Sequence, residues 1–514
     1  MEVTKPKVVI AGAGGGKTHQ MINEIIEIIP HLKNNPEKFC AVVTYTNAAT
    51  EEIKKRVSKK INIPHNLHIS TTHSFLTKFI IDPYAYLFNL LPLDKNYIDK
   101  VNLTYKSKNF FAEKASCIKK ANELSSQKGI IIYDKILETS FELISQETIC
   151  NQVSTRLAYI FVDEYQDMRL YQHKIFNEII LKGKTNFYCI GDPLQSIYNF
   201  SYTQSQLSKE PKPNGFLASP ILEFNRNKHF ETNTITINNR CSKSIINLIN
   251  NFNNKIGYQQ ELPEEKKCNQ IPVYFIIGDT KPEIVEKYSQ IMVNHNIQKE
   301  NGKMFSLIIA KDWDTFNDIS NVNKINFDNG TTKTMFHECS RIILSTLGIN
   351  KTTFLKIIPY KDKREKHLKY REFCFSILKD IRIHNFEVDR AYIINEFKQK
   401  FKINLPDDTN KNINTSKALE GLKIVTKYSD SDRFCSSIHN SKGLEATNVL
   451  VISKTNKQLL KWLDFKNVVH DTDDDYRLGY VAFSRAREIL CITSLEKPDK
   501  TVIDKLKSLN IQIV

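Results

Sequence analysis

The strongest constraint on the fold of this 514-residue chain is a glycine-rich loop near its start, between an apolar run and a helical pattern. Residues 8–10 predict a buried strand, and apolar residues at three- and four-residue spacing after the loop predict a helix. In such a strand–loop–helix unit the backbone N–H groups of the loop surround phosphates, and the helix N-terminus adds its positive end. The loop consists of Ala11, Gly12, Ala13, Gly14, Gly15, Gly16, Lys17 and Thr18.

The polar residues of this loop have expected partners on a bound nucleoside triphosphate. Lys17 can reach the β- and γ-phosphates, and the hydroxyl of Thr18 can bind Mg²⁺. Ala11 stands at the first position of the loop in place of glycine, but alanine still allows close approach of the phosphates. The loop therefore predicts a triphosphate ligand without identifying the reaction.

A second signal is an acidic pair directly after another apolar run. Residues 158–162 predict a buried strand that ends in Asp163 and Glu164. One carboxylate can hold Mg²⁺ through its water shell, and the next can orient and deprotonate an attacking water. We therefore expect Asp163 at the metal and Glu164 as the general base.

Further apolar runs alternate with helical patterns and predict an α/β fold with a doubly wound parallel sheet. Residues 39–44, 67–70 and 186–190 have the composition of buried parallel strands. Ligands of such sheets bind at the carboxyl ends of the strands. The polar loops at 45–47 and 72–74 follow two of these strands, so we expect them to bind a second ligand beside the nucleotide.

Charge and composition limit the kinds of partner that this chain can have. Lys and Arg number 73 against 57 acidic residues, a net charge of +16, which favours a polyanion, although an AT-rich genome would also produce many surface lysines. Ten cysteines, scattered singly, predict reduced thiols in a cytoplasmic protein. No apolar run approaches the roughly 20 residues of a membrane span, and the first residues are too polar for a signal peptide, so we expect no membrane association.

With these motifs in hand, the chain resembles the superfamily 1 DNA helicases of the UvrD, Rep and PcrA type. The segment Asp-Glu-Tyr-Gln-Asp at 163–167 is similar to the second motif of that family, and residues 191–198 are similar to the third. Further segments resemble the remaining motifs in the same order along the chain. They are residues 43–49 and 72–75 for DNA contact, 237–242 at the start of the second motor domain, 437–445 for the fifth motif and 480–487 for the sixth.

The resemblance implies two RecA-like motor domains, each a doubly wound parallel sheet with a helical insert. Both inserts are shorter than in the large members of the family, and no nuclease constellation follows residue 490. The expected division is 1–74 and 158–232 for the first motor domain, 75–157 for its insert, 233–311 and 423–514 for the second motor domain, and 312–422 for its insert.

Within the second motor domain, residues 271–277 and 305–310 predict strands, and residues 282–294 predict the helix between them. The acidic run at 471–475 is interpreted as a solvated face or a helix start rather than a metal site.

The resemblance also implies the roles of the site residues. ATP would be hydrolysed with Mg²⁺ in the cleft between the motor domains, where Gln195 senses the γ-phosphate and Arg240 and Arg485 act as arginine fingers. Single-stranded DNA would be contacted by polar side chains and by aromatic rings that stack on bases, with core packing as the alternative for each ring. These residues are Tyr45, Thr46, Asn47, His73, Ser74, Tyr198, Phe200, His439 and Lys442.

Contacts to the adenine base depart from the family pattern. The upstream glutamine motif has no room before the first strand, His19 replaces the usual arginine after the loop, and Asn239 replaces a tyrosine that stacks on adenine. We expect His19 to stay near the nucleotide and other nucleoside triphosphates, such as GTP or CTP, to serve nearly as well as ATP. Ser201 also replaces the arginine that usually follows the third motif.

The leading hypothesis is a helicase that moves 3′ to 5′ on single-stranded DNA or a single-strand/duplex junction. Its role would lie in DNA repair or in antiphage defence beside a nuclease or sensor partner. The alternative is a nucleotide-switched DNA sensor that recruits a partner without processive unwinding. A small-molecule kinase would share only the loop and would leave the fifth and sixth motifs unexplained.

Overall fold

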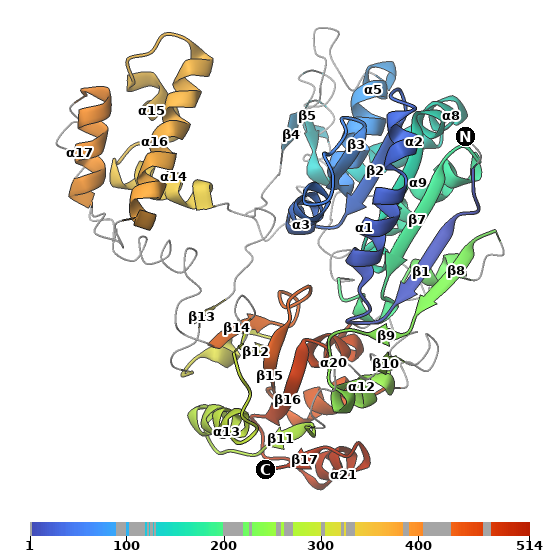
Figure 1. Ribbon diagram of the computed structural model, residues 1–514, viewed down its shortest axis with the longest axis vertical. Coiled ribbons are helices and arrows are strands. Elements are labelled where there is room, and N and C mark those ends of the chain that lie inside the picture. Colours follow the sequence, from blue (N-terminus) through green and yellow to red (C-terminus); the bar gives the residue numbers. More distant parts are fainter. Residues whose placement is uncertain are drawn as a thin grey trace. The chain divides into compact units, whose positions relative to one another are not determined.

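A computed structural model of the chain divides into two compact units, Met1–Asn326 with Phe434–Val514, and Phe327–Arg433 (Figure 1). The structure describes residues 3–88, 99–101, 119–120, 123, 127, 130–198, 219–225, 229–252, 259–261, 271–299, 304–319, 323–324, 335–383, 390–403, 433–465 and 474–514.

The first sheet of the larger unit has six parallel strands in the order β3-β2-β6-β7-β1-β8. The predicted apolar runs form its inner strands and the edge strand β3, whereas the opposite edge strand, β8, is polar and largely exposed. Strand β1, which carries the glycine-rich loop, pairs with both β7 and β8. The strands are β1 (Lys7–Ala11), β2 (Phe39–Thr44), β3 (Leu67–Thr71), β6 (Leu157–Val162), β7 (Asn186–Gly191) and β8 (Glu231–Ile235).

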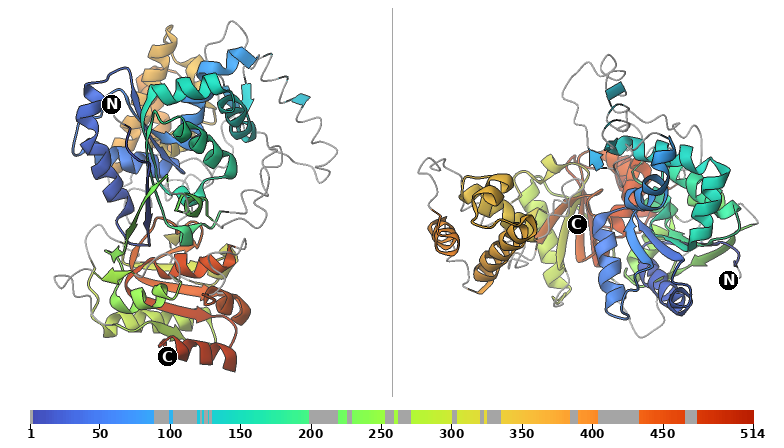
Figure 2. Two further views of the ribbon diagram at one scale, coloured as in Figure 1. Left: turned by 90° about the vertical axis from the view of Figure 1, so that its right-hand side faces the viewer. Right: turned by 90° about the horizontal axis from the view of Figure 1, so that it is seen from above.

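Helices cover both faces of this sheet (Figure 2), because successive side chains of a strand point to opposite faces. Val9 packs with α1 (Lys17–Glu27), α2 (Ile29–Lys33) and α3 (Asn47–Ser58). Its neighbours Val8 and Ile10 belong to the opposite core. That core includes side chains from α4 (Thr72–Leu76), η1 (Thr77–Ile81), α7 (Ile136–Ile144), α8 (Glu147–Arg156) and α9 (Leu170–Leu181).

The described ends of the span 75–157, predicted as an insert, contribute to the core of the first sheet. Phe79 and Leu137 are buried there with the strand residue Val162. Between them, β4 (Asp99–Val101) and β5 (Ile130–Ile132) form a separate parallel pair. Among the described residues of the span, the structure also has α5 (Asp82–Tyr84), η2 (Ala85–Phe88) and η3 (Tyr133–Lys135).

The second sheet of the larger unit has seven strands in the order β13-β14-β12-β15-β16-β11-β17, and its central pairs are parallel. Every residue of β15 is buried, as expected for a strand covered on both faces. The predicted strands near 274 and 308 are confirmed. The strands are β11 (Tyr274–Ile276), β12 (Ser306–Ala310), β13 (Asn323–Lys324), β14 (Arg433–Ser437), β15 (Ala446–Ser453), β16 (Ala486–Ser494) and β17 (Gln512–Ile513).

Helices also cover both faces of the second sheet. The predicted helix near 282–294 is confirmed as α13 (Lys281–Asn294) and packs on one face. The opposite face packs with α19 (Asn456–Trp462), α20 (Asp475–Phe483) and α21 (Lys500–Ser508), and this core is continuous with that of the first sheet. The described end of the predicted acidic run starts α20, with Asp474 at the cap position; residues 471–473 lie outside the described residues.

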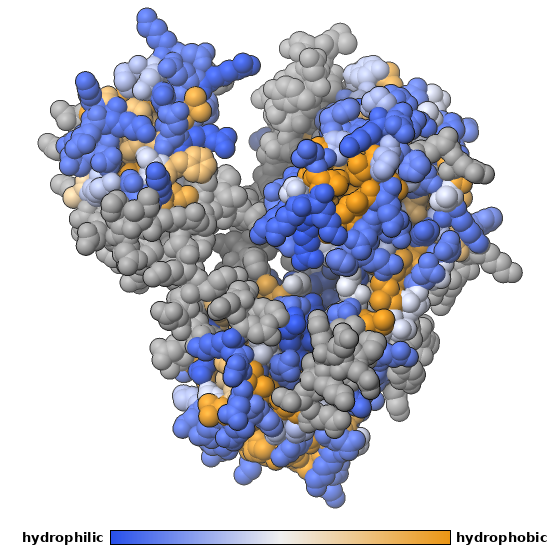
Figure 3. Space-filling view, viewed as in Figure 1, coloured by the Kyte–Doolittle hydropathy of each residue, from blue (hydrophilic) through white to orange (hydrophobic). Residues whose placement is uncertain are grey.

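The second unit is helical and has its own core. Phe354, Phe373 and Phe397 pack together in it, from α15 (Lys351–Ile357), α16 (Lys363–Ile383) and α17 (Arg390–Phe401). Helix α14 (Met335–Thr346) completes this core. The outward side chains of the unit are mostly hydrophilic on the face in Figure 3. Within the described ranges of the whole chain, we find no helix of the length and apolarity that a bilayer crossing requires.

Candidate nucleotide and DNA site

The glycine-rich loop joins β1 to α1 in a geometry that requires glycine at two positions. Gly14 and Gly16 have φ values of 72° and 74°, in the left-handed region that L side chains rarely adopt. A Cβ atom at Gly14 would also lie 2.4 Å from the side-chain oxygen of Asn238. The ammonium of Lys17 lies 3.5 Å from the carbonyl oxygen of Gly12, so it curls over the loop that it is predicted to serve.

The acidic pair lies at the end of β6. The backbone N–H of Asp163 donates to Val43 on the neighbouring strand at 2.9 Å, and one oxygen of its carboxylate accepts the N–H of Glu164 at 2.9 Å. Glu164 has φ 50° and ψ 45°, a left-handed conformation that costs free energy for a non-glycine residue and is concentrated at functional sites. The amide of Gln166 donates to the Glu164 carboxylate and holds it in place.

Burial and neighbouring charges shift the pKa values of Asp163 and Glu164 in opposite directions. Burial, with the nearby charge of Glu164, raises the pKa of Asp163 to about 7. Burial would also raise the pKa of Glu164, but Lys17 and Lys442 outweigh it and hold that pKa below its ordinary value. Glu164 is therefore ionised at neutral pH, as a general base must be.

Gln195 is held from both sides at the end of β7. Its amide nitrogen donates to Asp192 at 2.7 Å, and its amide oxygen accepts from Arg485 at 3.3 Å. Arg485 is 1% exposed and donates through Nε to the carbonyl oxygen of Val481 at 2.8 Å. Burial, with Arg240 nearby, lowers the pKa of Arg485 to about 10, so the guanidinium stays charged at neutral pH.

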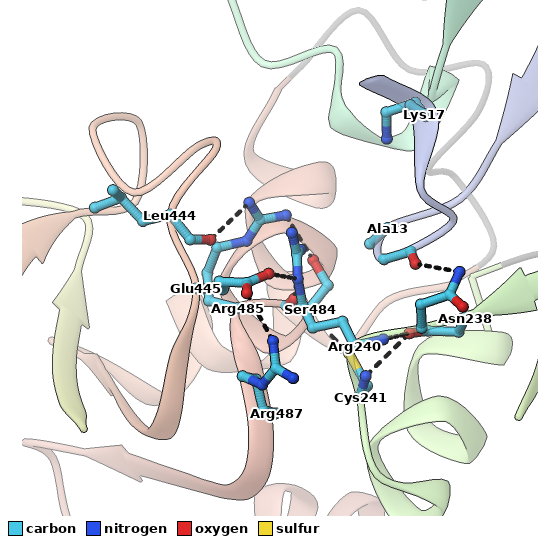
Figure 4. A network of polar contacts seen from close by, with 12 residues as sticks. Ala13, Lys17, Asn238, Arg240, Cys241, Leu444, Glu445, Ser484, Arg485 and Arg487 are labelled. Atoms are coloured by element: carbon cyan, nitrogen blue, oxygen red, sulfur yellow. Dashed lines mark hydrogen bonds and ion pairs between the residues drawn. The ribbon is translucent and has the colours of Figure 1, made fainter. Parts of the chain in front are cut away.

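Arg240 lies beside Arg485 in a second network (Figure 4). Its Nε donates to the carboxylate of Glu445 at 2.7 Å, and the other oxygen of that carboxylate accepts from Arg487 at 2.7 Å. Arg240 also donates to the backbone carbonyl of Ser484 at 3.2 Å. Both predicted arginine fingers are therefore held close together. Glu445 closes the predicted fifth motif, but its place between Arg240 and Arg487 was not predicted from the sequence.

The predicted DNA residues Tyr45, Tyr198 and Lys442 form one contiguous stack. The rings of Tyr45 and Tyr198 are 5.4 Å apart at 14°, and the Lys442 ammonium lies 4.9 Å from the centre of the Tyr198 ring. Lys442 also pairs with Asp167 and donates to the carbonyl oxygen of Gln195 at 2.7 Å. Its side chain is only 7% exposed and that of Asp167 only 2%. The ammonium of Lys442 is thus buried and already has partners within the protein.

The other predicted DNA residues have varied surroundings. Thr46 accepts the N–H of Ala49 at 3.1 Å and caps α3, next to the exposed Asn47. The ring of His73 stacks on Tyr133 at 4.5 Å. The backbone N–H of Ser74 donates to the hydroxyl of Thr71. The carbonyl oxygen of His439 accepts from the hydroxyl of Tyr198 at 3.4 Å. Phe200 and Ser201 lie outside the described residues.

Sequence reasoning assigned no role to several residues that join this site together. Arg477 is fully buried and donates to the carbonyl oxygen of Ser196 at 2.5 Å. Tyr480 and Gln259 bind the backbone of Ala13 in the glycine-rich loop. Tyr480 opens the sixth motif and could have been suspected, whereas Gln259 belongs to no pattern.

The donor set at the loop fits Mg²⁺. Thr18 and Asp163 offer the hard oxygen ligands that this ion prefers. Among the described residues, no group of three or more His, Cys, Asp or Glu could hold a metal by itself. A magnesium ion bound with a nucleotide needs no such cluster, because phosphate oxygens and waters complete its shell.

A glycine-rich loop on one parallel sheet and Arg485, contributed from beside the other sheet, are arranged as in P-loop enzymes that act on nucleoside triphosphates. Residues 1–96 and 88–212 match the model of the UvrD/REP helicase N-terminal domain. Together with the relatives described next, this match shows that the chain is similar to helicases of the UvrD/Rep type.

Curated relatives extend over most of the chain. A probable DNA helicase II homolog of Mycoplasma genitalium is 24% identical over 98% of this chain and 84% of its own length. The ATP-dependent DNA helicase Rep of Buchnera aphidicola (Schizaphis graminum) is 24% identical over 96% of this chain and 91% of its own. The Gabija protein GajB of Bacillus cereus is 28% identical over 57% of this chain and 55% of its own.

Proposed function

We propose that the chain is an ATP-dependent DNA translocase and helicase that moves 3′ to 5′ on single-stranded DNA. The observation that carries this proposal is the bond from Arg485, after the second-sheet helix α20, to Gln195 beside the first sheet. Because the arginine and the phosphate-binding loop belong to different sheets, hydrolysis would depend on how the two sheets meet. Such dependence is what couples chemistry to movement along a strand.

In the proposed mechanism, Lys17 neutralises the β- and γ-phosphates, and Glu164 takes the proton of the attacking water. Gln195 contacts the γ-phosphate, while Arg240 and Arg485 stabilise charge that develops on the transferring group; an arginine finger typically contributes about 10³ to 10⁵ in rate. Thr18 and Asp163 would hold Mg²⁺, which adds further positive charge at the phosphates.

On the DNA side, the proposal gives the stacked rings of Tyr45 and Tyr198 the role of a base-stacking surface. Stacking tolerates any base, which suits a translocating enzyme. Thr46, Asn47, His73, Ser74 and His439 would contact the strand around it. Lys442 joins this surface to the nucleotide side, because it contacts both Tyr198 and the backbone of Gln195.

The first test is steady-state hydrolysis of ATP and GTP with and without single-stranded DNA. We expect strong stimulation by DNA, and loss of turnover in Lys17→Ala because the phosphates lose their cation. We also expect ATP and GTP to be used at similar rates, since the exposed Asn239 offers no aromatic ring for the base. Turnover that Lys17→Ala leaves intact would refute the site, and a tenfold or larger preference for ATP would refute the loosened base recognition.

A separate assay measures direction. The chain is loaded on a single strand with a fluorophore at one end, and arrival is followed by the change in fluorescence. Signal from a label at the 5′ end supports 3′ to 5′ movement, and signal from a 3′ label alone contradicts it.

The alternative function, a nucleotide-switched DNA sensor, is separated by Glu164→Gln. This change keeps the shape and nucleotide binding but removes the general base. A motor loses translocation in this variant, whereas a switch keeps its DNA- and nucleotide-dependent capture of a partner. The similarity to GajB makes a defence role beside a nuclease or sensor the second candidate, and phage-plating efficiency with wild type against Lys17→Ala would test it.

A further inference from the structure

Both backbone polar groups of Ala13, in the middle of the glycine-rich loop, are bound by side chains from distant parts of the sequence. Its N–H donates to the hydroxyl of Tyr480 at 2.9 Å, across 467 residues. Its carbonyl oxygen accepts from the amide of Gln259 at 3.0 Å, across 246 residues. The next carbonyl oxygen, that of Gly14, accepts the N–H of Asn239 at 2.8 Å. The loop is therefore fixed at its centre by residues outside its own sheet.

Tyr480 extends this contact toward the catalytic glutamine. Its hydroxyl accepts from Ala13 and donates to Asp192 at 3.1 Å, and the same oxygen of Asp192 accepts the amide of Gln195 at 2.7 Å. Gln195 in turn accepts from Arg485. One hydroxyl thus links the loop that would hold the phosphates to the glutamine and arginine that would act on the γ-phosphate.

Only a hydroxyl can make this link, because it donates and accepts at the same atom. Tyr480 is fully buried, so water cannot replace a lost partner for Ala13 or Asp192. A phenylalanine at this position would fill the same volume and leave both groups one bond short. The ring and the hydroxyl can therefore be tested separately.

We propose that Tyr480 is a positioning residue that fixes Gln195 relative to the glycine-rich loop, so that the γ-phosphate and the groups acting on it are aligned. This inference rests on the proposed hydrolysis of nucleotide at this site. Tyr480 acts through Asp192 and Ala13 rather than on the nucleotide. Of the loop N–H groups, only that of Ala13 bonds to Tyr480 among the described contacts, and Lys17 does not, so Tyr480 governs turnover more than binding.

The test is Tyr480→Phe in the full-length chain, with ATP hydrolysis measured in saturating single-stranded DNA. We expect kcat to fall about tenfold and KM for ATP to stay within about threefold, since a hydrogen bond to a charged group is lost away from the bound phosphates. The matched control is Tyr288→Phe, whose fully buried hydroxyl bonds to Ser306 at 3.1 Å in the core around α13. The control removes a comparable bond and should leave kcat unchanged.

A kcat within twofold of wild type in Tyr480→Phe overturns the inference, as does an equal loss in Tyr288→Phe or a rise in KM that accounts for the whole effect. Asp192→Asn gives a second route if Tyr480→Phe does not fold, because one amide oxygen replaces a carboxylate that accepts from Leu194, Gln195 and Tyr480. It should show the same loss of kcat alone, and the double variant should lose no more than either single variant. Wild-type kcat in Asp192→Asn would also overturn the inference.

Glu164→Gln, measured in parallel, separates this inference from the proposed function. Loss of turnover there with wild-type turnover in Tyr480→Phe refutes the role of Tyr480 alone. Retained turnover in Glu164→Gln refutes the proposed hydrolysis mechanism itself.

Discussion

Lys442 and Asp167 form a buried ion pair between segments 275 residues apart in the sequence. Removing Lys442 leaves the Asp167 carboxyl without its partner in the interior, where burial already raises its pKa to about 7, and breaking such a pair typically costs about 3 to 5 kcal/mol. We expect Lys442→Met to lower the free energy of unfolding by about 3 kcal/mol, and Lys442→Met with Asp167→Asn to recover at least half of this loss. Urea denaturation of the wild type, Lys442→Met and the double variant measures these free energies of unfolding.

DNA affinity distinguishes this structural role of Lys442 from the DNA contact that its motif predicts. If the ammonium serves mainly the ion pair, Asp167→Asn should weaken DNA binding as much as Lys442→Met does. Weakened binding in Lys442→Met at unchanged stability would instead assign the ammonium to DNA. The motif identifies Lys442 as important, but Asp167 as its partner could not be read from the sequence, because nothing in either segment specifies the other.

At the scale of elements, the Nδ1 atom of His68 on β3 lies 3.1 Å from the Nζ atom of Lys78 on η1. Burial first, and then the charges of Lys78 and Lys54, lower the pKa of His68 to about 4. Below its ordinary pKa of about 6.5 the unfolded chain takes up a proton that the folded chain does not, so stability is lost as pH falls from about 6.5 to 4. His68 remains partly solvated, so we expect a loss of only about 1 kcal/mol.

The measurement for His68 is the difference in unfolding free energy between wild type and His68→Gln at several pH values. As pH falls from 7 to 5, the wild type should lose unfolding free energy relative to His68→Gln, because glutamine takes up no proton in the unfolded chain. A difference that stays constant over this range would show that His68 is not held neutral.

Elements with strong apolar patterns were predictable, and polar ones were not. Strands such as β1, β6 and β12 are predicted by apolar runs, because a parallel strand is buried on both faces. Strand β8 has the sequence Glu-Thr-Asn-Thr-Ile and is held by backbone pairing to β1 at the sheet edge, so hydrophobicity carries no sign of it. The sixth motif points to Tyr480 on α20, but its proposed role could not be predicted, since it depends on where that helix meets Ala13.

At the scale of the molecule, we expect that the helical unit 327–433 can be replaced by a short linker without unfolding the rest of the chain. Strand β13, before it, pairs with β14, which begins at its end, so the chain leaves and returns through neighbouring strands. A glycine–serine linker of about eight residues can span that gap, because an extended chain covers about 3.3 Å or more per residue. The unit has its own core, and the proposed nucleotide-site residues all lie outside it.

We therefore expect the variant with residues 327–432 replaced by such a linker to fold and to hydrolyse ATP within about threefold of the intact chain. Circular dichroism and steady-state turnover measure the two outcomes. A folded variant without turnover would mean that the helical unit is needed at the nucleotide site.

The order of residues in this site also has a consequence for synthesis on the ribosome. Lys17 is made before the first sheet gains its last strand, which ends at Ile235, and Arg485 is made only after the second sheet has begun. At about 5 to 20 residues per second, a nascent chain with a complete first sheet waits roughly 12 to 50 seconds before that arginine exists. During this interval the proposed loop would hold nucleotide without Tyr480 and Arg485, so we expect a chain interrupted by premature termination to bind ATP without consuming it.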